Sequence, residues 1–176
     1  MVSVPYFIAG GGIMFIEVPY NRAGALEYAK TWALKRNPNY LNFQGLGGDC
    51  TNFASQCIFA GSKVMNFAPV TGWYYISSYN RTASWSGVEY LFNFLTSNQA
   101  AGPHAVETDA DHIEVGDIVQ LGNGNNHFYH SPVVVEITAQ DILLAAHTYD
   151  AFMKPLNDYQ YSTVRYLHIE GIRKYR

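Results

Sequence analysis

The order of the sequence periodicities constrains the fold of this chain most strongly. Apolar residues recur at helical intervals in three segments before residue 98, whereas short strand-like runs follow Gly102 and Pro103. Helices followed by strands are typical of an α+β domain in which N-terminal helices pack on a C-terminal antiparallel sheet. The chain has 176 residues, of which 48% are apolar, and this is enough for one well-buried domain.

The patterns place the expected elements as follows. Helices are expected over residues 22–36, 52–60 and 84–97, the last with Ser84 or Ser86 as its N-cap. Strands are expected over residues 115–121, 129–138, 142–148 and 164–172. The sheet is therefore expected from the second part of the chain alone.

Cys50 lies where Gly47, Gly48 and Asp49 give way to the second helical segment. Free backbone N–H groups and the positive end of the helix dipole favour a thiolate there, and they can also hold an oxyanion. Cys50 is therefore predicted to be a nucleophile with a lowered pKa. Cys57 lies on the same helix, roughly 10 Å along its axis, which is too far for a disulfide and indicates a small buried hydrophobe.

A thiol nucleophile needs a base and a group that orients the base. His130 opens one expected strand and His147 closes the next, so antiparallel pairing predicts that they lie close together at one sheet edge. This arrangement predicts a Cys–His–His set with Cys50. The same three residues, or a pair formed by His127 and His130, could instead hold zinc, but the chain lacks HExxH-type spacing.

Composition narrows the choice of partners. A net charge of −3 with 14% charged residues gives no electrostatic reason to expect nucleic acid or an anionic membrane surface. No apolar run approaches the ~18 residues of a membrane span, so no membrane insertion is expected. The first residues carry no basic n-region, and no signal peptide is expected.

Seven motifs, in this order, resemble the Putative amidase domain family: PYNRAGALEYAKTWALKRNPNY, GGDCTNFASQCIFAG, GWYY, SWSGVEYL, VGDIVQL, HSPVVVEI and AAHTYD. That family belongs with the papain-like cysteine peptidases and amidases, close to the NlpC-type and CHAP enzymes that cut bacterial cell walls. The resemblance implies one catalytic amidase-like domain over residues 19–176, preceded by an extension over residues 1–18. It matches Cys50 to the nucleophile, His130 to the base and His147 to the third polar residue, with Asp150 as the alternative.

The resemblance also implies a function, namely hydrolysis of an amide bond in peptidoglycan through a thioester. The bond would be the N-acetylmuramoyl-L-alanine bond or one within the stem peptide, and the enzyme would act extracellularly or at the cell wall without metal or cofactor. Trp73, Tyr74 and Trp85 are expected in the groove walls, with core packing as the alternative role. Two other functions stay open: a non-catalytic wall-binding module, and a cysteine acyltransferase or deamidase that acts on proteins.

Overall fold

The computed structural model describes residues 14–125 and 127–176. The α-helices are α1 (Arg22–Trp32), α2 (Cys50–Ser62), α3 (Ala83–Ser86) and α4 (Val88–Ser97). The strands of the large sheet are β1 (Phe15–Val18), β4 (Gly102–Thr108), β5 (Ile118–Asn123), β6 (His127–His130), β7 (Val133–Ile137), β8 (Ile142–Ala146), β9 (Ala151–Pro155) and β10 (Thr163–Tyr175). A separate hairpin pairs β2 (Tyr75–Ser77) with β3 (Asn80–Arg81).

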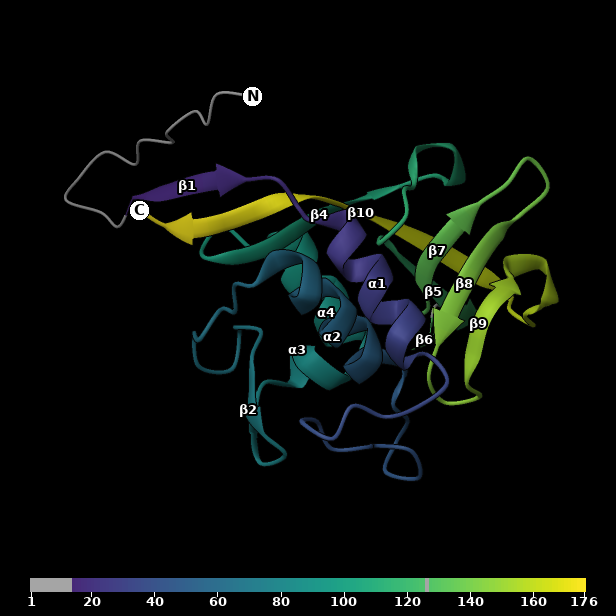
Figure 1. The fold of residues 1–176 in the computed structure, drawn as a ribbon, viewed down its shortest axis with the longest axis horizontal. Helices are drawn as coiled ribbons and strands as arrows, with labels where there is room; N and C mark the ends of the chain where they lie inside the picture. The colour runs from purple at the N-terminus through teal and green to yellow at the C-terminus, as the bar shows by residue number, and fades with distance from the viewer. Residues whose placement is uncertain (1–13, 126) are drawn as a thin grey trace.

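The large sheet has the strand order β1-β10-β5-β7-β8-β9, while β4 also pairs with β10 and β6 with β5. Every pairing is antiparallel. Figure 1 shows the helices gathered beside this sheet, with the β7–β8–β9 meander at the other end of the molecule from β1. The predicted α+β class is confirmed.

Apolar residues fill both faces of the central strands. On β7, Val133 and Val135 join the core under the helices, whereas Val134 joins a smaller core on the opposite face. β5 alternates in the same way, since Ile118 faces the helices and Val119 faces the second core. The period-2 alternation of a strand accounts for this division. No helix of the described residues is long and apolar enough to cross a membrane.

Helices α1 and α2 pack very closely where α1 begins. The Asn21 side chain caps α1 by accepting a hydrogen bond from the Gly24 backbone N–H, and the Asn21 N–H donates to the Gly61 carbonyl on α2. A Cβ added to Gly61 would lie 2.3 Å from a ring carbon of Tyr20. Glycine at this position is what allows the two helices to approach.

Several expected elements have different bounds in the structure. Helix α1 ends at Trp32 instead of residue 36. The third expected helix is two helices, because Gly87 is extended between α3 and α4. Neither Ser84 nor Ser86 is an N-cap, since both lie inside α3, whose N-cap is Thr82.

The strand expected over residues 129–138 is also divided. It forms β6 and β7, with Ser131 and Pro132 between them. Proline has no N–H for a strand ladder, which explains the interruption.

Three strands of the large sheet have no counterpart among the expected ones: β1, β4 and β9. β1 pairs with β10, so residues 15–18 belong to the same sheet as the rest of the chain. The division into an extension and one catalytic domain at residue 18 stays a prediction, and residues 1–13 lie outside the described residues.

Candidate active site

Cys50 is the first residue of α2, as the sequence predicted. Its side chain is buried, with 6% of the residue exposed, and its thiol is free. The sulfur lies 3.8 Å from the Thr51 hydroxyl and 3.9 Å from the backbone carbonyl of Tyr129 at the end of β6. Helix α2 therefore presents the thiol to the strand that carries His130. Cys57 lies deeper in the same helix, fully buried, in the place expected of a small hydrophobe.

Burial decides the protonation of the Cys50 thiol. Removal from water raises the pKa of Cys50, and the nearby Asp49 charge raises it further. Hydrogen bonds from Ser131 and Thr51 to the sulfur lower the pKa only in part. The expected lowering of this pKa is therefore wrong for the free enzyme, because desolvation outweighs the hydrogen bonds to the sulfur. Cys50 is therefore protonated, as a thiol, in the free enzyme.

His130 ends β6 and is 8% exposed. Burial, with a smaller contribution from the positive charge of Lys154, lowers the pKa of His130 to about 4. The imidazole is therefore neutral at pH 7 and able to accept a proton. Its aromatic neighbour is Tyr159, whose ring centroid lies 5.8 Å from that of His130. No described residue forms a hydrogen bond with the His130 ring.

The interruption after His130 is held by buried side chains. Ser131 accepts hydrogen bonds through its hydroxyl oxygen from Thr51 (3.3 Å) and from the Gln120 amide (3.0 Å). Gln120 in turn accepts a 2.7 Å bond from the Arg165 guanidinium. These contacts connect the first turn of α2 to the residue that follows His130. They fix the relative positions of the thiol and the imidazole.

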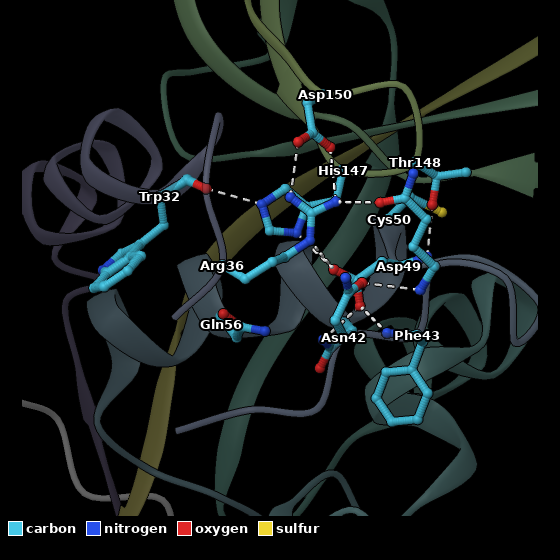
Figure 2. A network of polar contacts seen from close by, with 12 residues as sticks. Trp32, Arg36, Asn42, Phe43, Asp49, Cys50, Gln56, His147, Thr148 and Asp150 are labelled. Carbon is cyan, nitrogen blue, oxygen red and sulfur yellow. Dashed lines mark hydrogen bonds and ion pairs between the residues drawn. The ribbon is translucent and has the colours of Figure 1, made fainter. Parts of the chain in front are cut away.

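His147 makes other contacts than the ones expected of it. Its Nδ1 lies 2.7 Å from an Asp49 carboxylate oxygen, and its Nε2 donates to the Trp32 carbonyl at 2.8 Å (Figure 2). Its ring also stacks on Phe53 at 4.1 Å between centroids. Both nitrogens are thus occupied away from His130. The structure does not bring His147 into contact with the base that it was expected to orient.

Asp49 is the centre of this buried network and directly precedes Cys50 in the chain. Besides His147, its carboxylate accepts hydrogen bonds from the Asn52 amide (2.8 Å) and from the Phe43 backbone N–H (2.9 Å). The Arg36 guanidinium lies 3.2 Å from it as an ion pair. Every one of these neighbours donates a hydrogen bond to the carboxylate or carries a positive charge beside it.

Asp150, the alternative third residue, is taken up by the same network. Both of its oxygens accept hydrogen bonds from Arg36 at 2.8 Å, as Figure 2 shows, and this pairing lowers the pKa of Asp150. The turn that contains it is also tied to Asp49, whose backbone N–H donates to the Thr148 hydroxyl at 2.6 Å. Asp150 therefore braces the turn and does not approach His130.

The two tryptophans expected in the groove are core residues. Trp73 and Trp85 are both 0% exposed. Their indole N–H groups donate to side chains of α2, Trp73 to Ser55 at 3.0 Å and Trp85 to Asn52 at 2.9 Å. Fully buried rings cannot line a groove, so the expected substrate-binding role fails for both. Tyr74 is half-buried against Phe67, and its role as a groove residue stays a prediction.

The alternative zinc site has no counterpart in the described part of the chain. Within residues 14–125 and 127–176, no group of three or more histidine, cysteine, aspartate and glutamate side chains is placed to hold a metal ion. His127 begins β6 and is exposed, whereas His130 ends it and is buried. Independence from metal stays a prediction.

Sequence reasoning missed the residues that hold the site together. Asp49, Arg36, Lys154 and Tyr159 were not singled out, although Asp49 directly precedes the predicted nucleophile. An acidic residue at a helix N-terminus is usually assigned to capping, but the Asp49 side chain makes no cap hydrogen bond here. Its carboxylate instead binds the nearby Phe43 N–H and Asn52 amide, and the distant His147 ring.

The chain is similar to a curated protein and matches a family model. A curated protein of Bacillus subtilis (strain 168), "Uncharacterized protein YhbB", is 36% identical over 140 residues. The match covers 77% of this chain and 43% of that protein, so the chain spans less than half the length of this relative. No solved structure matches the chain. The family model described as Putative amidase domain matches residues 19–169, and its description suggests amide hydrolysis. The chain therefore belongs to the Putative amidase domain family.

Proposed function

We propose that this protein is a papain-like cysteine amidase that cleaves an amide bond of bacterial peptidoglycan. One observation carries the proposal: the first residue of α2 presents a thiol to the end of the antiparallel strand that carries a neutral, buried histidine. Amide hydrolysis follows the family description, and the peptidoglycan substrate follows the resemblance to cell-wall hydrolases. In this proposal the enzyme acts at the cell wall, outside the cytoplasm.

The raised pKa of Cys50 and the lowered pKa of His130 determine the chemistry. A neutral thiol and a neutral imidazole exist at pH 7 in the free enzyme. The sulfur attacks the amide carbon as His130 takes the thiol proton, and the proton then passes to the departing amine as the C–N bond breaks. Water, activated by His130, attacks the thioester and releases the carboxylic acid and the thiol.

The N-terminus of α2 supplies the electrostatic part of the mechanism. The backbone N–H of Cys50 makes no backbone hydrogen bond within the described residues. It points from a helix N-terminus and is suited to stabilise the oxyanion of the tetrahedral intermediate. Since the free thiol and imidazole share no hydrogen bond in the described structure, substrate binding has to tighten their contact, as is common in active sites.

His147 has a positioning role in this proposal. Its Nδ1 contacts the Asp49 carboxylate, and Asp49 directly precedes Cys50 in the chain. The imidazole therefore positions the backbone of Cys50 and does not orient His130. Its removal is expected to lower turnover while His130 keeps its own pKa. A pH profile of kcat/KM for His147→Asn, compared with the wild type, separates these two roles.

The decisive experiment measures the products released from purified peptidoglycan. Cys50→Ala and His130→Ala are expected to keep the fold and to lose activity by at least about a thousandfold, because residues that act as a unit each carry most of the rate. Cys57→Ala and His127→Ala are the matched controls, since neither side chain belongs to the site. New L-alanine amino termini indicate cleavage at the muramoyl bond, and other new peptide termini indicate an endopeptidase.

Three results would overturn the proposal. Activity within about tenfold of the wild type in either active-site variant would remove the assigned residue from the mechanism. Absence of any release from peptidoglycan by the wild type, together with ammonia release from protein glutamine, would identify a deamidase.

A chelator is expected to leave the rate unchanged, whereas loss of activity that zinc restores would favour metal chemistry.

A further inference from the structure

An open hollow of about 400 Å³ lies beside β6, and one of its lining residues, Tyr159, contacts the His130 ring. Its lining comes from the ends of β5 and β6 and from residues 159–162. Three tyrosines contribute to it: Tyr129, Tyr159 and Tyr161. Its volume falls in the range of small-molecule sites, and aromatic walls are common in them. The proposed mechanism does not use this hollow.

Tyr159 carries an unsatisfied polar group at this place. Its hydroxyl is buried and has no hydrogen-bond partner within the described residues. Burial raises the pKa of Tyr159 to about 12, so the phenol keeps its proton and can donate. A buried hydroxyl without a partner costs free energy unless a ligand supplies an acceptor.

A positive charge lies against the same ring. The Lys154 ammonium, on β9, is 4.1 Å from the centroid of the Tyr159 ring. Lys154 is half-buried, and no carboxylate of the described residues lies within ion-pair distance of it. The charge therefore sits close to His130 without a counterion. An unpaired, partly buried cation beside an unpaired donor is suited to receive an anion.

We propose that Lys154 and Tyr159 bind a carboxylate of the substrate, on the side of the departing amine. The inference rests on the proposed function, because His130 is the group that hands the proton to that amine. Tyr159 contacts the His130 ring and therefore lies on the side of the departing amine. The Cys50 sulfur, which keeps the acyl half as a thioester, lies against the backbone of Tyr129 instead. The enzyme thus selects an amine product that carries a carboxylate, as a stem peptide does.

Binding to a protein without its nucleophile tests this site independently of hydrolysis. The probes are the tetrapeptide L-Ala-γ-D-Glu-L-Lys-D-Ala and the same peptide with both free α-carboxylates converted to carboxamides. Calorimetry with the Cys50→Ala protein is expected to show at least about tenfold tighter binding of the carboxylate form, the size of a charged hydrogen-bonded pair. Lys154→Met is expected to abolish this preference, and Tyr159→Phe to reduce it.

Lys174→Met is the matched control, because Lys174 is exposed on β10, and it is expected to keep the full preference. Equal affinity for the two peptides, no binding of either peptide, or an unchanged preference in Lys154→Met would each overturn the inference. None of these results bears on whether the wild type hydrolyses peptidoglycan, which the product assay decides separately. If hydrolysis fails but the tetrapeptide preference is found, the proposed function falls and the carboxylate site remains.

Discussion

Replacing Asp49 by alanine tests whether the buried network holds the start of α2. The carboxylate is completely buried, and it serves the His147 ring, the Asn52 amide and the Phe43 N–H. Asp49→Ala leaves His147 Nδ1 and the Phe43 N–H without this acceptor and the Asn52 amide with the Leu41 carbonyl alone. It also removes one of the two carboxylate partners of Arg36. Removal of one member of a buried pair costs about 3–5 kcal/mol. Since domains are stable by about 5–15 kcal/mol, the variant is expected to fold only marginally.

Urea unfolding measures this loss. With a slope of about 2 kcal/mol per molar urea, the midpoint of Asp49→Ala is expected to fall by about 2 M, while the slope itself stays unchanged. Asp49→Asn keeps one acceptor oxygen and is expected to lose less, about 1–3 kcal/mol. Asp158→Ala, at an exposed position, is the control and is expected to change the midpoint little. A loss below about 1 kcal/mol for Asp49→Ala would refute the reasoning, because the network would then carry no stability.

Three further predictions follow from the protonation states of the site. Because the pKa of His130 is lowered to about 4, the acid limb of kcat/KM is expected near pH 4 instead of the ~6.5 of free histidine. The unfolded chain binds this proton more readily than the folded protein. The contribution of His130 to the free energy of unfolding is therefore complete above about pH 6.5 and is lost as the pH falls to about 4. An equal decline of the urea midpoint in His130→Gln would contradict this linkage. Burial raises the pKa of both thiols, so iodoacetamide labelling at pH 6 is expected to be slow, to accelerate with rising pH and to reach Cys50 before the more deeply buried Cys57. Peptide mapping checks the order, and rapid labelling of Cys50 at pH 6 would show that the free enzyme holds a thiolate.

Local patterns predicted those parts of the site that depend on neighbouring residues in the chain. The two glycines and Asp49 before a helical run located Cys50 at a helix start. The apolar run after Pro132 predicted β7, but not that His130 ends the separate strand β6. The antiparallel pairing of β7 with β8 followed from their short connection. These predictions needed no knowledge of distant contacts.

The other features of the site depend on contacts between residues that are far apart in the sequence, and no local pattern indicates such contacts. Asp49 and His147 are 98 positions apart, and their pairing decides where the imidazole points. The sign of the Cys50 pKa shift likewise depends on how completely distant residues exclude water from the sulfur. Trp73 and Trp85 illustrate the same difficulty, because an aromatic cluster in a sequence suits a groove as well as a core, and only the packing against α2 decides.

The position of β10 has a consequence for how the molecule is made. This strand pairs with β1, with β4 and with β5, so residues 163–175 join the two ends of the described chain and the middle of the sheet. On the ribosome, the segments that carry Cys50 and His130 emerge before it, and until then β4 and β5 expose unpaired edges that are open to aggregation. Such long-range pairing makes folding slow. Assembly of the proposed active site is therefore a late event in biosynthesis, completed only when the last strand of the sheet is in place.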